Sequence, residues 1–239
     1  MGKTGSRFVL AATLLLFGVS PAAAQWSWGV YGAGEFDTED VVFVGAGLRV
    51  APTTSWSWSP VFGVQGFWLQ IPAGEDDTSI TALTPSVGLQ RSFNDGAFGI
   101  HAGYQFQNED VAGATTTSAT VGEGAVAMAD LNWGASRPVA VQLLGSYNFG
   151  ADAFWGRARS TLRVATISPG ALRLGAEVAH MNQSDDADTT FDDGFSSTAI
   201  GPVLEWHTGR GVTLGAAAGR KLQEGDDATY FRFEMSLFP

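Results

Sequence analysis

Hydrophobic and polar residues alternate strictly at the end of the chain, in the stretch YFRFEMSLFP. A period of two residues predicts a β-strand with one apolar face and one polar face. A soluble sandwich would turn the apolar face to its core, whereas a transmembrane barrel would turn it to lipid and its charged face to the lumen. The apolar side consists of Phe231, Phe233, Met235 and Leu237, and the polar side of Tyr230, Arg232, Glu234 and Ser236.

Similar strand-like patterns recur along the chain, and no segment after residue 24 has a convincing helical period. Most have the length of about 9–11 residues that a tilted strand needs to cross a bilayer, or slightly more. Pro60, Pro85 and Pro202 lie in or beside such patterns and cannot donate to a ladder, so the pattern allows ten to fourteen strands, with about twelve expected. The expected strands are 26–36, 41–51, 61–71, 79–93, 97–107, 118–131, 138–149, 154–167, 172–182, 197–207, 212–222 and 229–238.

The first 24 residues have the organisation of a secretory signal peptide. Lys3 and Arg7 precede an apolar run from Phe8 to Val19, and small residues end the segment at Ala24. An uncleaved anchor helix is the alternative, but this run is shorter than the ~20 residues that a membrane-spanning helix requires. We therefore expect export, with a signal peptide over 1–24 and one all-β domain over 25–239.

The composition narrows the range of partners and chemistry. The chain has 24 acidic against 13 basic residues, which argues against nucleic acid as a partner. It contains no cysteine, which excludes disulfides, thiolate zinc sites and thiol catalysis. A closed ladder of strand hydrogen bonds within lipid would stabilise such a chain without cross-links.

The odd-numbered and even-numbered connections between the expected strands differ in length and in acidic residues. The odd-numbered connections carry most of the acidic residues, including Asp76, Asp186 and Asp226, whereas the even-numbered ones are short and rich in Gly, Pro and Asn. Short turns on the periplasmic side and longer polar loops on the outer side are typical of outer-membrane barrels. A sandwich gives no reason to sort acidic residues in this way.

Aromatic residues gather in two bands near the ends of the expected strands, as two membrane interfaces would select. The expected inner band contains Trp26, Trp28, Trp56, Trp58, Trp133, Trp206 and Phe238, and the outer band Phe36, Trp68, Phe106, Phe149, Phe154, Trp155 and Phe231.

With its leader, alternating strands and aromatic final strand, the chain resembles bacterial outer-membrane β-barrel proteins. The resemblance is architectural and extends over residues 25–239. It implies a closed antiparallel transmembrane β-barrel in the outer membrane, surrounded by membrane lipid and lipopolysaccharide and inserted by the barrel-assembly machinery. Such proteins usually end on an aromatic residue in phase with the last strand; here Phe238 is one step out of phase, followed by Pro239.

Charged residues on the expected inner faces are the candidate functional site. They suit either a charged constriction for anionic small solutes or a set of paired charges that fills the lumen. The same strand pattern places Glu35 opposite Arg232, where the first and last strands would pair. The candidate lumen-lining residues are Arg157, Arg159, Arg163, Arg173, Glu177, Arg232 and Glu234.

Other chemistry has weaker support. The acidic segment QSDDADTTFDDG lacks the glycine of an EF-hand loop, and we expect neither a metal nor a cofactor. His180 with Ser184 or Asp185 is the histidine pairing that best suits an outer-membrane hydrolase of lipids or peptides, with His101 and His207 elsewhere. The sequence therefore predicts a narrow pore or a passive structural barrel, with the hydrolase as the alternative and no catalytic residue assigned.

Overall fold

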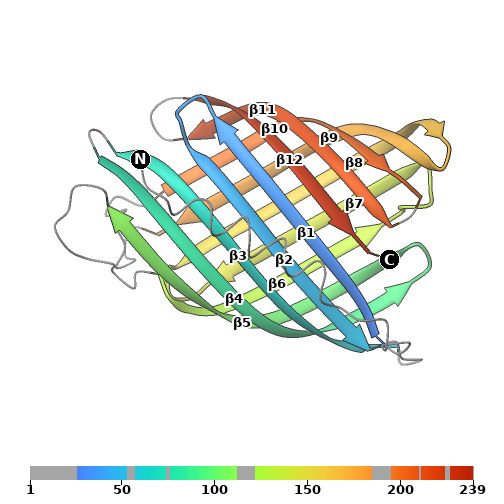
Figure 1. Ribbon diagram of the computed structural model, residues 1–239, viewed down its shortest axis with the longest axis horizontal. Coiled ribbons are helices and arrows are strands. Elements are labelled where there is room, and N and C mark those ends of the chain that lie inside the picture. Colours follow the sequence, from blue (N-terminus) through green and yellow to red (C-terminus); the bar gives the residue numbers. More distant parts are fainter. Residues whose placement is uncertain are drawn as a thin grey trace.

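The protein forms a closed barrel of antiparallel strands in the computed structural model, which describes residues 26–52, 57–73, 76–111, 122–184, 195–209, 211–223 and 227–238. The strands are inclined to the long axis of the molecule, so the near and far walls cross in Figure 1. The expected signal peptide lies outside the described residues. The strands are β1 (Trp26–Asp37), β2 (Val42–Pro52), β3 (Ser59–Ala73), β4 (Asp76–Phe93), β5 (Gly96–Val111), β6 (Gly124–Trp133), β7 (Val139–Asn148), β8 (Ala153–Ile167), β9 (Gly170–Gln183), β10 (Phe195–His207), β11 (Val212–Gln223) and β12 (Ala228–Leu237).

Each strand pairs with its neighbours in the chain, and β1 closes the barrel by pairing with β12. Closure leaves no free sheet edge, as a sheet in lipid requires. The expected twelve-stranded barrel is confirmed. β6 begins at Gly124 and continues to Trp133, and residues 118–121 of the strand expected there lie outside the described residues.

The two faces of the wall have opposite character, because successive side chains of a strand point to opposite sides. The outer face is apolar and exposed: the exposed fraction is 52% for Leu83, 53% for Ile200 and 61% for Phe233. The inner face carries charged side chains that are almost fully covered, including Arg173 at 0% and Glu177 at 3%. This distribution is the reverse of a soluble domain and suits a barrel whose outside is in lipid.

The barrel has two different ends, which we call the loop end and the turn end. At the turn end, Phe93 pairs with Gly96 and Ile167 with Gly170, so two-residue turns join β4 to β5 and β8 to β9. Asp95 in the first of these turns has a positive φ of 65°, a conformation that Asp tolerates better than most residues. Connections at the loop end join β1 to β2, β3 to β4, β5 to β6, β7 to β8, β9 to β10 and β11 to β12. These are the connections whose sequences contain most of the acidic residues.

Phe238 closes the seam at the turn end. Its backbone N–H donates to the Gly211 carbonyl over 2.9 Å. A Cβ atom at Gly29 of β1 would lie only 2.1 Å from the Phe238 ring, so the ring rests directly on this glycine. The shift of Phe238 out of the lipid-facing phase therefore lets its ring pack across the first strand.

Aromatic side chains lie near both ends of the barrel, as expected. Phe36 of β1 stacks on Phe231 of β12 at the loop end, with 5.4 Å between ring centroids. Trp58 and Phe98 make an edge contact of 6.2 Å at the turn end. By the alternation of β8, Trp155 belongs to the inner face with Arg157, while its neighbour Phe154 is 42% exposed on the outer face. Trp56 lies outside the described residues. No helix in the described ranges is long and apolar enough to span a membrane.

Candidate functional site: the charged lumen

A carboxylate on β9 is the centre of a buried ion-pair network. Glu177 accepts hydrogen bonds from Nε and Nη2 of Arg159 on β8, over 3.0 and 2.6 Å. Its other oxygen accepts from Arg232 and from the Tyr230 hydroxyl, both on β12. The Glu177 side chain is 1% exposed, so these contacts replace its water shell.

Arginines of β8 extend this network across the lumen to strands that are not their neighbours. Arg159 Nη1 lies 2.9 Å from Glu205 of β10 and 2.9 Å from Glu234 of β12. Arg157 also binds Glu234, and its Nη2 donates to Gln142 of β7 over 2.7 Å. Because β8 and β12 are four strands apart, these contacts bridge the interior rather than follow the wall.

The network continues to the seam between β12 and β1. Glu35 is paired in register with Arg232, as expected from the sequence, and their side chains lie 3.2 Å apart. Lys221 of β11 binds both Glu35, over 3.2 Å, and Asp37, over 2.8 Å. Asp37 also accepts backbone N–H groups of Glu39 and Val41, which fixes the connection between β1 and β2.

The charged residues of these contacts number nine, four cations and five carboxylates that largely balance one another. We call them the Arg–Glu network. Burying an unpaired ion is costly, so each member depends on its partners. Balanced pairing favours the second interpretation of the candidate residues, a filled lumen, over a constriction of free positive charge. The members are Glu35, Asp37, Arg157, Arg159, Glu177, Glu205, Lys221, Arg232 and Glu234.

Two predicted lumen residues, Arg163 and Arg173, have a different role. Arg173 is 0% exposed and donates to the carbonyls of Ala135, Arg137 and Pro138 in the β6–β7 turn. Arg163 binds the Ser136 carbonyl of the same turn. Both arginines therefore hold this turn against the inner face at the turn end.

A smaller cluster lies in the half of the lumen formed by β2–β6. Asp130 of β6 binds Nη1 of Arg49 on β2 over 2.8 Å and Nε2 of His101 on β5 over 2.9 Å. The Arg49 side chain is 27% exposed, whereas those of Arg159 and Arg232 are 5% and 6% exposed. We call Arg49, His101 and Asp130 the Asp130 cluster.

Small residues leave a cavity next to this cluster. Its volume is about 10 Å³, room for about one water molecule, and it is bordered by Tyr31, Arg49, Gln65 and Ser86. The Tyr31 hydroxyl donates to Gln65 over 2.6 Å. A Cβ atom at Gly47 would lie 2.3 Å from the Tyr31 ring, so only glycine lets the ring lie flat on β2.

The three histidines do not form a hydrolytic site in the described part of the chain. His180 bonds to the Thr198 hydroxyl over 2.9 Å, and Asp185 lies outside the described residues. His101 is 7% exposed and bonds to Asp130. His207 contacts Glu205 over 3.2 Å and the Thr213 hydroxyl over 3.3 Å at the turn end. No group of metal-ligating side chains occurs among the described residues, and most of the acidic loop expected at 183–194 lies outside them.

Sequence reasoning missed several members of these clusters. Glu205 shares the inner row of β10 with Val203, and the exposure of Leu204 and Trp206 shows the alternation that could have revealed it. Lys221 is likewise one step from the exposed Leu222. The contact between Arg49 and Asp130 left no signal, because 81 residues separate them and the two strands are not adjacent.

The chain matches the family described as cellulose biosynthesis protein BcsS over residues 71–237. It belongs to this BcsS family. The match begins in β3 and ends at the last residue of β12, so it includes all strands that carry the Arg–Glu network except β1. No curated protein sequence matched the chain.

Solved structures with a similar fold are outer-membrane barrels. An outer-membrane channel from Pseudomonas putida F1 has 13% identity and a TM-score of 0.55, with 92% of this chain and 100% of that chain covered. The translocator domain of the autotransporter NalP from Neisseria meningitidis has 11% identity and a TM-score of 0.47, with coverage of 98% and 95%. The first likeness agrees with the strand pairing, and the BcsS-family chain is an outer-membrane β-barrel.

Proposed function

We propose that this BcsS-family barrel is a narrow, largely filled channel in the outer membrane of a cellulose-producing cell, passing water and small ions but not a glucan chain. It would then support cellulose biosynthesis without being the exit for the polymer. The family's description supports the link to cellulose, and the filled interior supports the limit on size.

The observation that carries the proposal is the set of contacts from β8 to β12 across the lumen. Arg159 and Glu234 lie 2.9 Å apart, and both are shielded from solvent. A barrel of ~8 strands is filled by its side chains and one of ~16 leaves an aqueous channel, so twelve strands permit either outcome. Here the charged side chains bridge the interior, which leaves the β2–β6 half as the route for small solutes.

A fully closed, passive barrel is the second candidate, and the small size of the cavity beside Arg49 favours it. This barrel would act through its surface loops or its place in the membrane. The enzyme alternative receives no support from the geometry of His180, whose ring bonds to Thr198.

Planar-bilayer recording of the refolded protein tests the proposal. We expect discrete current steps well below those of a 16-stranded porin recorded under the same conditions. Silence over many verified insertions would favour the passive barrel. Steps of porin size would contradict both, because they require an open lumen.

Cellulose output in cells tests the limit on polymer passage. Ser86→Trp places a large side chain beside the existing cavity, and Ala129→Trp on the lipid-facing side of β6 is the matched control. If the glucan does not use the lumen, a strain that carries Ser86→Trp in place of the native gene should export as much cellulose as the control. Selective loss of export with Ser86→Trp, at equal barrel levels, would show that the polymer passes through the lumen.

A further inference from the structure

The lipid-facing wall has a groove over β10–β12 that the proposed function does not use. Its volume is about 260 Å³ and its surface is almost entirely apolar. Register explains its shape, since Ala216 pairs with Leu204 on one side and Phe233 on the other, and Ala218 pairs with Phe231. The small side chains of β11 therefore form a trough between larger neighbours.

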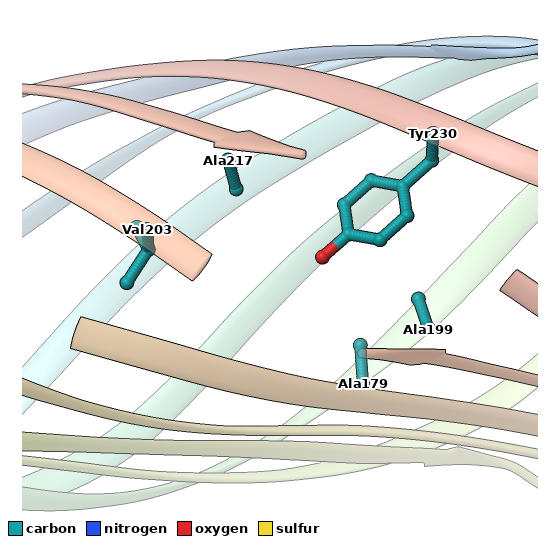
Figure 2. Packing of buried hydrophobic residues seen from close by; sticks show 5 residues of the cluster. All are labelled: Ala179, Ala199, Val203, Ala217 and Tyr230. Atoms are coloured by element: carbon teal, nitrogen blue, oxygen red, sulfur yellow. The ribbon is translucent and has the colours of Figure 1, made fainter. Parts of the chain in front are cut away.

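Pro202 extends the trough into the wall. The ladder between β10 and β11 passes from Ile200–Arg220 to Val203–Ala217 without partners for Gly201 and Pro202. Proline has no N–H to donate, which accounts for an interrupted ladder. Figure 2 shows the Tyr230 ring among the small side chains of Ala179, Ala199, Val203 and Ala217, and the last two of these also line the groove. This packing gives the groove a solid floor.

A cation lies at the loop-end limit of the groove. Arg220 follows Ala216 and Ala218 in the same lipid-facing row of β11 and is paired in register with Thr229. Thr229 lies two residues closer to the loop end than Phe231, which stacks on Phe36 in the aromatic band. Because aromatic bands mark the membrane interface, Arg220 lies at the level of the lipid headgroups.

Arg220 differs in position from the other cations of the described ranges, among which Arg137 lies in the β6–β7 turn and Arg163 and Arg173 bind that turn. The side chains of Arg49, Arg157, Arg159, Lys221 and Arg232 turn inward, and Arg91 lies on the outer face near the turn end. Arg220 is 61% exposed and makes a 3.2 Å contact with Asp227 through Nη2. Such an exposed pair is weak, so a stronger anion can compete for the guanidinium.

We propose that this groove and Arg220 form a binding site for a phosphorylated glycolipid of the outer leaflet. An acyl chain would lie along Ala216 and Ala218, and the lipid phosphate would bind the Arg220 guanidinium. Long polar loops mark the loop end as the outer side, which places Arg220 in the outer leaflet. An apolar groove that ends at a cation at headgroup depth fits one molecule that carries both an acyl chain and a phosphate, which favours a lipid over a second barrel.

Native mass spectrometry of the full barrel, extracted in mild detergent from membranes that contain lipopolysaccharide, tests this site. Purified lipid A is then titrated onto delipidated protein. Arg220→Gln removes the cation and Ala218→Phe fills the groove. Arg91→Gln, near the other end of the outer face, and Ala129→Phe, on the exposed outer face of β6, are matched controls. Folding of each variant is verified by its shift on unboiled gels.

We expect one lipid A to remain on the wild type and on both controls. Arg220→Gln should weaken lipid A binding about tenfold, the effect of losing one charge-assisted contact. Ala218→Phe should abolish retention. Equal binding of dephosphorylated lipid A or phosphatidylglycerol would overturn the assignment, and so would an equal loss in the controls. These results do not depend on conductance, so the site and the proposed function can fail separately.

Discussion

The two halves of the lumen stabilise their inward-facing charges with different sets of partners. In the Arg–Glu network of β8–β12 and β1, Arg159 and Arg232 each contact three carboxylates, and those of Arg159 are Glu177, Glu205 and Glu234. In the Asp130 cluster of the β2–β6 half, one carboxylate serves both Arg49 and His101, and the arginine keeps partial contact with solvent.

This difference shows that the side chains on the inner rows, and not strand number alone, decide how tightly a barrel interior is filled. Both halves have the same wall and the same alternation of side chains. One half places long, oppositely charged side chains on its inner rows, and these meet across the interior. The other places Gly45, Gly47, Gly63 and Ser86 on its inner rows, which leaves the small cavity beside Arg49.

Removing the central carboxylate should have the largest effect on stability. Glu177→Ala leaves Arg159 and Arg232 each short of a buried partner, and breaking a buried pair costs about 3–5 kcal/mol. We expect a loss of this size in the free energy of unfolding, measured by urea titration of the barrel in lipid vesicles. Asp227→Ala, whose partner Arg220 is 61% exposed, is the control and should cost less than about 1 kcal/mol. Equal losses would mean that the network is not buried in solution.

The equivalent change in the other half should cost less. Asp130→Ala removes the partner of Arg49 and His101, but the partly exposed Arg49 can recover water. We expect a loss of about 1–3 kcal/mol in the same urea titration. A loss as large as that of Glu177→Ala would remove the distinction between the two halves.

The next smaller effect should be the coupling energy between Arg232 and Glu35, the pair at the seam between β12 and β1. Arg232 contacts Glu35 over 3.2 Å and also binds Glu177 and Glu234. In a double-mutant cycle, Arg232→Ala and Glu35→Ala together should cost about 1 kcal/mol less than the sum of the single losses. Additive losses would show that Glu35 depends on Lys221 instead.

The smallest effect should come from a turn outside the membrane. Hydrogen bonds from Ser136 and Arg137 lower the pKa of Asp95 below its usual value of 3.8. A lowered pKa stabilises the fold above the unfolded-state pKa, and this contribution disappears as the pH falls through the folded-state value. As the pH falls below about 4, the Asp95→Asn variant should therefore lose slightly less free energy of unfolding than the wild type does. Urea titration at several pH values measures this difference. Arg137→Gln should act in the same direction, and an unchanged pH profile in both variants would contradict the role of this turn.

Much of the wall could be predicted from sequence because a barrel strand encodes its two faces locally. The alternation in residues 229–238 and the short turns at Asn94 and Pro169 require no knowledge of distant residues. The pairing of Glu35 with Arg232 followed from the strand pattern together with closure of the barrel.

The contacts across the lumen could not be predicted in the same way. The sequence assigned Arg163 and Arg173 to the same inner rows as Arg157 and Glu177, but it could not show that the β6–β7 turn would bind both arginines. Likewise, the contact between Arg157 and Glu234 depends on how far each side chain reaches across the interior. Alternation fixes which way a residue points, whereas the cross-section of the barrel decides what it meets.

Thiol labelling inside the lumen tests the difference between the two halves most directly, because the native chain contains no cysteine. Ser86→Cys borders the cavity of the β2–β6 half, and Ala217→Cys lies in the packed layer around Tyr230 in the other half. With a small cationic thiosulfonate reagent, we expect Ser86→Cys to react in the folded barrel and Ala217→Cys to react only after unfolding. Equal labelling rates in the folded protein, or faster labelling at Ala217→Cys, would contradict the account.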